Sequence, residues 1–384
     1  MPCSLYAFAL LCIKRKMKLV IDSKIPYIKG FAELLGETVY LPGAEISAAD
    51  VRDADVLIIR TRTRCDEALL EGSNVRFIAT ATIGYDHLDT DYLRRAGIAW
   101  TNCPGCNARS VAQYVESALL LLNAHGCWRG DEALAPATAP VKPADFDKSV
   151  FATLTLGVVG VGHVGRRVWE CARRMGFGNI LCCDPPRAER EGAAAFCTME
   201  EIARRCDVIT FHTPLTRAPQ PHPTFHLASA EWFASLRRRP VLLNSGRGEV
   251  VDTAALKRAL TDGTLRTAVI DTWENEPDID RELLGRVFLG TPHIAGYSAD
   301  GKANGTRMAL QAVARRFGLD PAPFDAVQPP ALPPQFCYYA ANGAAACDEA
   351  LRLYDPTRDS EALKQSPELF ENLRGDYPLR RENG

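Results

Sequence analysis

The chain carries at residues 157–165 the stretch Gly157-Val158-Val159-Gly160-Val161-Gly162-His163-Val164-Gly165. The pattern G-x-G-x-x-G falls on Gly160, Gly162 and Gly165. An apolar run typical of a strand precedes these glycines, and a helix-compatible stretch over Arg166–Met175 follows them. Asp184 comes nineteen residues after the last glycine, at the end of the next apolar run. A strand, a glycine turn, a helix and an acidic residue at this spacing predict a dinucleotide-binding site.

The residue types of this turn suit a nucleotide for physical reasons. The glycines permit a tight turn and a close approach of the backbone to a pyrophosphate, and the N-terminus of the following helix offers N–H donors and partial positive charge. Asp184 would accept hydrogen bonds from a ribose diol and repel a 2′-phosphate, so we expect NAD rather than NADP. Arg187 lies close by and could instead pair with such a phosphate. The alternative is a tight turn that binds no nucleotide.

Apolar runs alternate with helix-compatible stretches on both sides of this turn, which predicts parallel sheets built from βαβ units. The runs are continuously apolar, as expected for parallel strands buried on both faces. A helix over Ala108–Ala124, with Asn107 as its N-cap and one apolar face, would connect two such sheets. The expected strands are 18–22, 56–59, 76–80 and 98–101 before this helix, and 154–159, 180–184, 207–211, 241–244, 267–271 and 287–290 after it.

We therefore predict the α/β class, with two Rossmann-like, doubly wound parallel-sheet domains and a small C-terminal α/β unit. A chain of 384 residues is too long for one ordinary core. Residues 1–16 are expected to be an N-terminal extension, since the apolar stretch precedes its basic residues, the reverse of a signal peptide. The insert at 128–148 is expected to be a surface loop. The predicted domains are a discontinuous substrate-binding domain at 17–108 and 292–320, an NAD-binding domain at 109–291, a proline-rich linker at 321–334 and a C-terminal unit at 335–384.

The composition excludes several classes of function. The chain is 47% hydrophobic and 24% charged, as soluble globular proteins are. A formal charge of −2 gives no electrostatic reason to expect a nucleic acid or a membrane surface as partner. The 13 cysteines have no regular spacing, which indicates reduced thiols in a cytoplasmic enzyme. We expect no metal site, because His212 has no accompanying ligands in the sequence.

Three segments after the glycine turn each place one ionisable side chain just past an apolar run. They are Ser245–Gly248 with Arg247, Asp271–Pro277 with Glu276, and Thr291–Tyr297 with His293. Because the carboxyl ends of strands in an open α/β sheet form its ligand-binding edge, we expect these three groups to lie close together. Separately, each has a structural explanation: a surface arginine, a glutamate that starts a helix, and a packed histidine.

Together these groups suit the oxidation of a 2-hydroxy acid. The planar guanidinium of Arg247 can hold a carboxylate. His293 can take the alcohol proton, since the usual pKa of histidine is near 6.5. Glu276 can orient the imidazole and stabilise the imidazolium that forms.

With these residues the chain resembles the NAD-dependent D-2-hydroxyacid dehydrogenase family, whose catalytic residues are Arg, Glu and His in this order. The resemblance covers residues 17–320 and is carried by the segments 79–87, 104–108, 183–187, 210–215 and 290–306. The stretch His293-Ile294-Ala295-Gly296-Tyr297 is most similar to members that act on a phosphorylated sugar acid. Arg60 and Arg62 add positive charge suited to such a substrate.

The resemblance also implies roles for individual residues. It makes Arg247, Glu276 and His293 catalytic, and it places substrate contacts at Thr61, Thr82 and Tyr297. The similarity of the tail to a dimerisation domain implies a homodimer. Together with the glycine turn, the expected NAD contacts are Gly160, Gly162, His163, Val164, Gly165, Asp184, Thr213, Ser245, Asp271 and Gly296.

Two alternatives stay open at this point. One is a D-2-hydroxyacid dehydrogenase of the phosphoglycerate or glyoxylate type. The other is a non-enzymatic, NAD-sensing scaffold of the same fold, because an intact Arg–Glu–His set is compatible with both.

Overall fold

The computed structural model describes residues 16–130, 134, 136–139, 141, 145, 147–331 and 349–382. The chain forms two compact units. Unit 1 comprises residues up to Pro104 together with Ala303–Gln328, and unit 2 comprises Gly105–Lys302 together with residues from Pro329 onward. The expected N-terminal extension, much of the expected surface insert and residues 332–348 lie outside the described residues.

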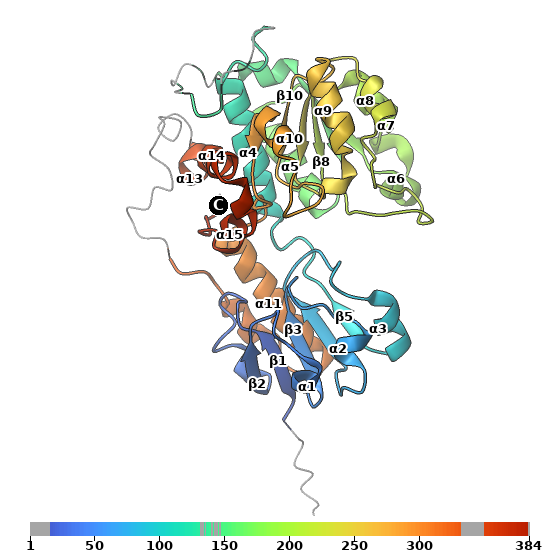
Figure 1. Ribbon diagram of the computed structural model, residues 1–384, viewed down its shortest axis with the longest axis vertical. Coiled ribbons are helices and arrows are strands. Elements are labelled where there is room, and N and C mark those ends of the chain that lie inside the picture. Colours follow the sequence, from blue (N-terminus) through green and yellow to red (C-terminus); the bar gives the residue numbers. More distant parts are fainter. Residues whose placement is uncertain are drawn as a thin grey trace, which may run out of the picture. The chain divides into compact units, whose positions relative to one another are not determined.

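Unit 1 is built on a five-stranded parallel sheet with the strand order β2-β1-β3-β4-β5 (Figure 1). All four strands that we predicted here are present, each within one residue of its expected bounds. The sequence analysis missed β2, because its residues are half-buried or exposed and form no continuous apolar run. The strands are β1 (Lys18–Asp22), β2 (Glu37–Leu41), β3 (Val56–Ile59), β4 (Phe77–Thr80) and β5 (Ala99–Thr101).

Unit 2 is built on a six-stranded parallel sheet with the order β11-β10-β9-β8-β6-β7. The chain passes from β6 to β7 on one side and then returns to β8 on the other side of β6. The carboxyl ends of β6 and β8 therefore flank the topological switch point, where open α/β sheets bind ligands. Both sheets confirm the predicted α/β class. The strands are β6 (Thr155–Val159), β7 (Asn179–Cys183), β8 (Val208–Phe211), β9 (Val241–Asn244), β10 (Thr267–Ile270) and β11 (Leu289–Gly290).

Short helices connect the strands and cover the sheets. Unit 1 contains α1 (Ala48–Val51), α2 (Glu67–Leu70), α3 (Thr90–Ala96) and most of α11 (Ala299–Arg316). The helices of unit 2 are α4 (Ala108–Ala124), α5 (His163–Met175), α6 (Pro185–Glu191), α7 (Met199–Arg205), α8 (Ala230–Ala234), α9 (Thr253–Thr261), α10 (Arg281–Arg286), α13 (Glu349–Leu353), α14 (Thr357–Gln365) and α15 (Phe370–Gly375).

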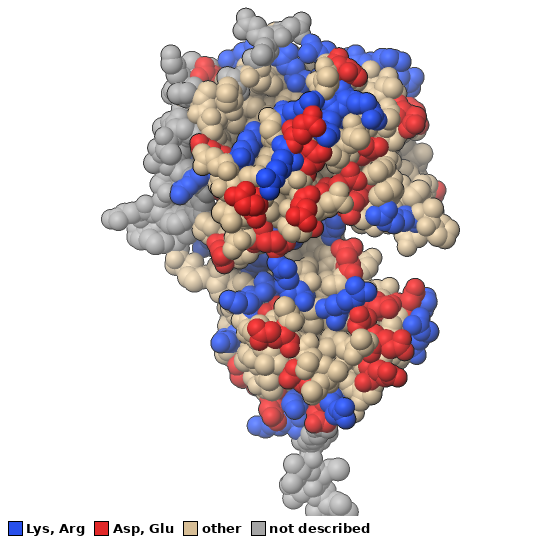
Figure 2. Space-filling model, in the orientation of Figure 1, with Lys and Arg blue, Asp and Glu red and all other residues tan. Residues whose placement is uncertain are grey.

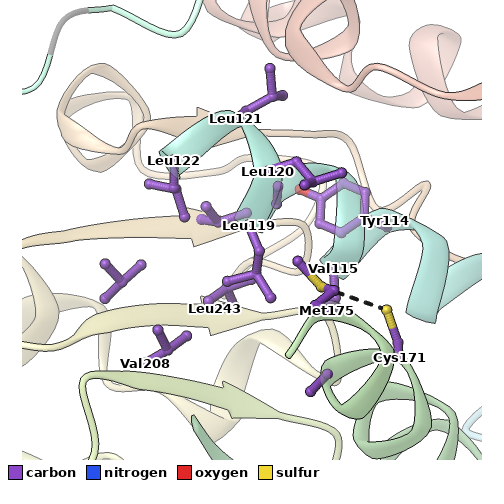
Figure 3. Packing of buried hydrophobic residues seen from close by; sticks show 14 of the residues in the cluster. Tyr114, Val115, Leu119, Leu120, Leu121, Leu122, Cys171, Met175, Val208 and Leu243 are labelled. Carbon is purple, nitrogen blue, oxygen red and sulfur yellow. Dashed lines mark hydrogen bonds between the residues drawn. The ribbon is translucent and has the colours of Figure 1, made fainter. Parts of the chain in front are cut away.

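Helix α4 has the predicted bounds but is buried more completely than one apolar face requires. Leu119 and Leu122 point toward the sheet, whereas Leu121 points the opposite way (Figure 3). On the opposite side α13 packs against α4, and the ring of Tyr354 lies 6.2 Å from that of Tyr114. Helix α4 is therefore covered on two sides, by the sheet and by α13. Asn107 occupies the N-cap position, but its side chain makes no capping hydrogen bond.

The described C-terminal residues pack as part of unit 2, whereas we expected a separate α/β unit. The regular structure of residues 349–375 is helical, and residues 376–382 form no helix and make one isolated bridge, between Arg380 and Ser298. Helix α14 packs against β11, and the Oγ of Ser360 accepts a hydrogen bond from the N–H of Gly290 at 3.0 Å. Leu363 and Phe370 are buried within the core of unit 2. The segment has no core of its own, and it covers the otherwise open edge of the sheet.

The first boundary between the compact units lies four residues from the predicted one, and the second lies eleven residues from it. They fall at 104/105 and 302/303, whereas we placed them at 108/109 and 291/292. The second boundary falls inside α11, which begins in unit 2 at Ala299 and continues into unit 1. The assignment of substrate binding to one unit and NAD binding to the other stays a prediction.

The visible surface carries no large region of one charge. Acidic and basic side chains are intermixed on the face that Figure 2 shows. Among the residues that the structure describes, no helix has the length and apolar character needed to cross a membrane.

Candidate active site

The glycine turn leaves the end of β6 and begins α5. Gly160 has a φ of +84°, and a Cβ at this position would lie 2.8 Å from the carbonyl carbon of His212. A Cβ on Gly165 would lie 2.0 Å from the oxygen of Gly160, so the helix can approach the strand only with glycine there. A Cβ on Gly162 would meet nothing within 4 Å, which leaves open space beside the helix N-terminus. These are the three separate roles that a pyrophosphate-binding turn requires.

Asp184 caps the N-terminus of α6 at the end of β7. Its carboxylate accepts hydrogen bonds from the N–H groups of Val161 at 2.8 Å and Arg187 at 3.1 Å, which ties it to the glycine turn. The guanidinium of Arg187 donates to the carbonyl of Val161 at 2.7 Å and to Glu191 at 2.8 Å. Because Glu191 compensates the charge of Arg187, this arginine is not set up to hold a 2′-phosphate.

The ends of β8 and β9 form a wall beside the glycine turn. His212 is hydrogen-bonded to Thr210 at 2.9 Å, and burial lowers the pKa of its imidazole to about 3, so the ring is neutral. Ser245 lies 3.5 Å from the Nδ1 atom of His212. The Oγ1 atom of Thr213 is buried and has no hydrogen-bond partner among the described residues. A buried hydroxyl without a partner and the space at Gly162 both fit a dinucleotide bound at this edge.

Arg247 lies in the turn that follows β9. The side chain of Asn244 braces this turn by donating to the carbonyl of Arg247 at 2.9 Å and accepting from the N–H of Gly246 at 3.2 Å. Arg247 is half-buried, and its Nη1 atom donates to the carbonyl of Gly246. A Cβ on Gly248 would lie 1.9 Å from the carbonyl oxygen of Trp273. This close approach holds the Arg247 turn directly against the loop that carries Glu276.

Glu276 and His293 form a close pair. The Nδ1 atom of His293 lies 2.8 Å from Oε2 of Glu276 and 3.1 Å from Oε1. Oε1 also accepts from the N–H of Trp273 at 3.0 Å. Burial raises the pKa of Glu276, but the His293 ring and these hydrogen bonds outweigh burial and hold the pKa below its usual value. With Nδ1 engaged by the carboxylate, Nε2 is the atom of His293 that can exchange a proton with a ligand.

Asp271 holds the turn on which His293 stands. His293 has a φ of +56°, a region that favours glycine and costs free energy for other residues. The buried carboxylate of Asp271 accepts from the N–H groups of Ile294 at 2.8 Å and Ala295 at 3.0 Å, and from the hydroxyl of Thr291 at 2.7 Å. Burial raises the pKa of Asp271, although His293 and these donors oppose the rise. Its predicted contact with NAD stays a prediction.

The predicted contact residues near His293 are also positioned by close packing. A Cβ on Gly296 would lie 2.0 Å from the Nδ2 atom of Asn107, so a larger residue there would displace the Asn107 side chain at the start of α4. Tyr297 is half-buried, and the ammonium group of Lys302 lies 3.7 Å from the centre of its ring.

Thr61 and Thr82 follow β3 and β4 in unit 1, at the carboxyl ends of these strands as expected. Thr61 is exposed. The hydroxyl of Thr82 donates to the carbonyl of Gly84 at 2.9 Å and is hydrogen-bonded to Thr80 at 2.7 Å. Arg60 is paired with the buried Asp22 at 2.9 Å. Because these residues belong to unit 1 and the Arg–Glu–His trio to unit 2, their convergence on one substrate stays a prediction.

Two arginines from the C-terminal segment, which were not predicted from the sequence, also contact this site. Arg374 lies 3.5 Å from Oε2 of Glu276, and the buried Arg380 donates to the carbonyl oxygens of Ile294, Ala295 and Tyr297. They are more than eighty residues away from these partners along the chain, so no local pattern could have revealed them. Within the described ranges, no group of three or more His, Cys, Asp or Glu side chains is arranged to hold a metal ion.

Comparison with known proteins shows which proteins this chain is similar to. The profile of the NAD-binding domain of D-isomer specific 2-hydroxyacid dehydrogenases matches residues 119–295. The erythronate-4-phosphate dehydrogenase of Bacteroides fragilis is 49% identical over 96% of this chain and 98% of its own length. The corresponding protein of Bacteroides thetaiotaomicron is 49% identical over 95% of this chain and 97% of its own length.

A solved structure shares the fold. The D-lactate dehydrogenase of Aquifex aeolicus, complexed with NAD and lactic acid, superposes with a TM-score of 0.62 at 23% identity. The match covers 78% of this chain and 96% of that one. At this identity the likeness concerns the fold alone.

Proposed function

The chain belongs to the erythronate-4-phosphate dehydrogenases, within the D-isomer specific 2-hydroxyacid dehydrogenase family, and we propose on this premise that it oxidises 4-phospho-D-erythronate with NAD. The product is (R)-3-hydroxy-2-oxo-4-phosphooxybutanoate. The reaction takes its place in pyridoxine 5′-phosphate (vitamin B6) biosynthesis. One observation carries the proposed chemistry: the contact of 2.8 Å between Glu276 and His293, in a loop packed against the Arg247 turn.

In the proposed mechanism Arg247 binds the substrate carboxylate through its planar guanidinium. Nε2 of His293 accepts the proton of the 2-hydroxyl group, because Nδ1 already faces Glu276. The imidazolium that forms is stabilised by the carboxylate of Glu276, whose lowered pKa keeps it ionised. NAD, when bound at the glycine turn, supplies the acceptor for the hydride.

The proposed cofactor contacts are those predicted at the glycine turn and at the strand ends beside it. Asp184, already anchored on the N–H groups of Val161 and Arg187, keeps further lone pairs for a ribose diol. The proposed substrate contacts are Thr61, Thr82 and Tyr297, with Arg60 and Arg62 adding positive charge for the phosphate.

A substrate panel tests this proposal. Purified protein is mixed with NAD and 4-phosphoerythronate, 3-phosphoglycerate or glycolate, and NADH absorbance is followed. We expect kcat/KM for 4-phosphoerythronate to exceed that for the other acids by about 10²-fold, because an unfilled phosphate or hydroxyl subsite leaves polar groups without partners. Equal rates on all three acids would refute the substrate assignment. NAD binding without turnover of any 2-hydroxy acid would favour a non-enzymatic, NAD-sensing scaffold.

We further propose that the protein acts in the cytoplasm as a homodimer. The support is the similarity of residues 353–355 and 373–382 to a dimerisation domain. Light scattering coupled to size-exclusion chromatography tests the oligomeric state. A mass equal to that of one 42.1 kDa chain would contradict the dimer.

A further inference from the structure

We propose that the C-terminal segment 370–382 is part of the active site of this proposed dehydrogenase, with Arg374 and Arg380 as positioning residues for the Glu276–His293 pair. Neither arginine needs to touch the substrate in this proposal. Arg374 acts on the carboxylate of Glu276, and Arg380 acts on the backbone turn that carries His293. The inference rests on the proposed function of that pair.

Arg380 is fully buried, and its guanidinium donates hydrogen bonds to the turn after His293. Its Nη1 atom donates to the carbonyls of Ile294 at 3.1 Å and Tyr297 at 2.9 Å, and its Nη2 atom donates to Ala295 at 2.5 Å. Three successive contacts to one turn from one rigid, planar group fix the geometry of that turn.

The surroundings of Arg380 show that this burial is compensated. Removing a guanidinium from water costs several kcal/mol unless its donors and its charge find partners. Its Nη2 and Nε atoms also reach α4, at the carbonyl of Ser110 and the side-chain oxygen of Gln113, both at 3.2 Å. The ring of Tyr354 lies 3.8 Å from the guanidinium, and the half-buried Asp359 supplies a nearby acidic group. The charged group is therefore held firmly between α4 and the His293 turn.

Asp271 and Arg380 hold the same turn through complementary groups. Asp271 accepts from the N–H groups of Ile294 and Ala295, and Arg380 donates to the carbonyl oxygens of the same two residues. The backbone N–H and the backbone carbonyl of both Ile294 and Ala295 thus have hydrogen-bond partners in a buried place. This double hold explains how His293 keeps a left-handed backbone conformation.

Arg374 acts on the pair through charge. Its Nη1 atom lies 3.5 Å from Oε2 of Glu276, the same oxygen that lies 2.8 Å from Nδ1 of His293. At 3.5 Å the contact with Glu276 is an ion pair. The carboxylate is therefore shared between an arginine that is always charged and an imidazole that is charged only when it holds a proton. Both side chains are shielded, with exposed fractions of 24% for Arg374 and 17% for Glu276.

The groups that face this pair determine the expected sign of the effect. Asp271, from the end of β10, interacts with His293, and Arg374, from α15, interacts with Glu276. Tyr297 and Glu371 interact with Arg374. Removing the positive charge of Arg374 leaves Glu276 with His293 as its charged partner, beside the neutral N–H of Trp273, and this stabilises the imidazolium. The base then needs a higher pH to lose its proton, so the acid limb of the rate profile for oxidation moves upward.

The first test compares Arg374→Gln with Arg374→Lys in the full-length protein. The pH profile of kcat/KM is measured with NAD and 4-phosphoerythronate, or with whichever 2-hydroxy acid the panel shows to be turned over. For Arg374→Gln we expect the acid limb to move upward by about 0.5–1 pH unit, while Arg374→Lys restores most of the original position. Arg204→Gln removes an exposed positive charge on α7 and should leave the profile unchanged. An Arg374→Gln profile that superposes on the wild type overturns the role of Arg374.

If no hydroxy acid is turned over, NMR titration of the His293 imidazole replaces the rate profile. The same upward shift in Arg374→Gln then supports the electrostatic role, and its absence refutes it. The role of Arg374 and the proposed substrate can thus fail separately.

The second test concerns Arg380. Because Arg380→Met can prevent folding, Arg380→Lys is measured beside it, since lysine keeps the charge and loses the planar set of donors. For Arg380→Lys we expect kcat to fall by about tenfold or more while the Kd for NAD stays within about threefold. An unchanged kcat overturns the positioning role. A parallel loss of kcat and NAD binding, with unfolding in the thermal melt, also overturns it in favour of a purely structural role.

Discussion

Two acidic side chains lie close to His293, and the protein uses them in opposite ways. Glu276 faces the imidazole ring, with its carboxylate 2.8 Å from Nδ1. Asp271 faces the backbone, and its oxygens accept from the N–H groups of Ile294 and Ala295. The pKa of Glu276 lies below its usual value, whereas the pKa of Asp271 lies above it.

The difference teaches what decides the charge of a buried carboxyl group. Burial raises the pKa in both cases, but a potential cation in direct contact outweighs burial for Glu276. For Asp271 the influence of His293 and of the neutral O–H and N–H donors does not outweigh burial. Glu276 is therefore suited to follow the charge of the imidazole during a reaction, and Asp271 is suited to hold the geometry of the turn.

The largest expected effect on kcat comes from removing His293, the residue that lies close to both carboxylates. His293→Ala should lower kcat by about 10²–10⁴-fold, as for the loss of a general base. NAD affinity should change little, because the ring lies at the end of β11 and the glycine turn follows β6. Steady-state kinetics and NAD titration measure the two quantities. A kcat near that of the wild type would contradict the assigned role.

Glu276→Gln tests the carboxylate that faces the ring. We expect kcat to fall by about 10²-fold, because an amide cannot stabilise the imidazolium as a carboxylate does. The free energy of unfolding should change by less than about 1 kcal/mol, since glutamine keeps an oxygen for the N–H of Trp273. Kinetics and urea unfolding on the same preparation separate the two effects. A large loss of stability with kcat preserved would reverse the comparison.

Asp271→Asn tests the carboxylate that faces the backbone. Asparagine presents an NH₂ group where an oxygen now accepts, so at least one buried donor of the turn loses its partner. We expect a loss of about 1–3 kcal/mol in the free energy of unfolding and a fall in kcat of about tenfold. Asp262→Asn, at an exposed position after α9, is the matched control. Unchanged stability of Asp271→Asn relative to this control would show that the turn holds without it.

Asp184 is a third carboxylate that, like Asp271, accepts hydrogen bonds from backbone N–H groups, but it lies at the glycine turn. If its free lone pairs serve a ribose diol, Asp184→Ala should reduce the preference for NAD over NADP by about tenfold. The ratio of kcat/KM values for the two cofactors measures the preference. An unchanged ratio would count against the ribose assignment.

The smallest expected effect is on the pH dependence of stability. Because the pKa of Glu276 is lowered in the folded state, its contribution is present above its usual value of 4.5 and is lost as the pH falls below it. The pKa of Asp271 is raised, so the folded state retains its proton longer, and stability falls as the pH rises above 3.8. Urea unfolding across this range measures how the free energy of unfolding changes with pH. The loss of stability at low pH should be smaller in Glu276→Gln, and the loss of stability with rising pH should be smaller in Asp271→Asn. Equal slopes in both variants and the wild type would show that neither shift exists.

Features with local causes were predictable from the sequence. The glycine turn could be predicted because its glycines allow a tight turn and a close approach of the helix to the strand. Helix α4 could be predicted because its apolar positions repeat at helical spacing. The edge strand β2 was missed because half-buried residues leave no apolar run. Arg247, Glu276 and His293 could be selected as candidates from the sequence, because each follows an apolar run that predicts a strand.

Features with distant causes were not predictable. The pairing of His293 with Glu276 was expected from the sequence, because both residues follow strand ends, whereas the contacts of Arg374 and Arg380 depend on how the last helices pack against β11 and α4. The full burial of α4 has the same origin, since its second face is covered by α13. A periodic pattern states which face is apolar, but it does not state which later segment will cover the opposite face.

The hold of Arg380 on the His293 turn has a consequence for how the protein is made. A ribosome adds residue 380 after the sheet of unit 2 and after the turns that carry Arg247, Glu276 and His293. Ser110 and Glu382, which are joined by a hydrogen bond, are 272 positions apart. During synthesis the sheet, the glycine turn and the Asp271 brace can form while the carbonyls of Ile294 and Ala295 still lack their guanidinium. The nascent chain can therefore form its glycine turn before the His293 turn is complete, and on the proposed role of Arg380 its catalysis requires the segment 370–382 to be docked.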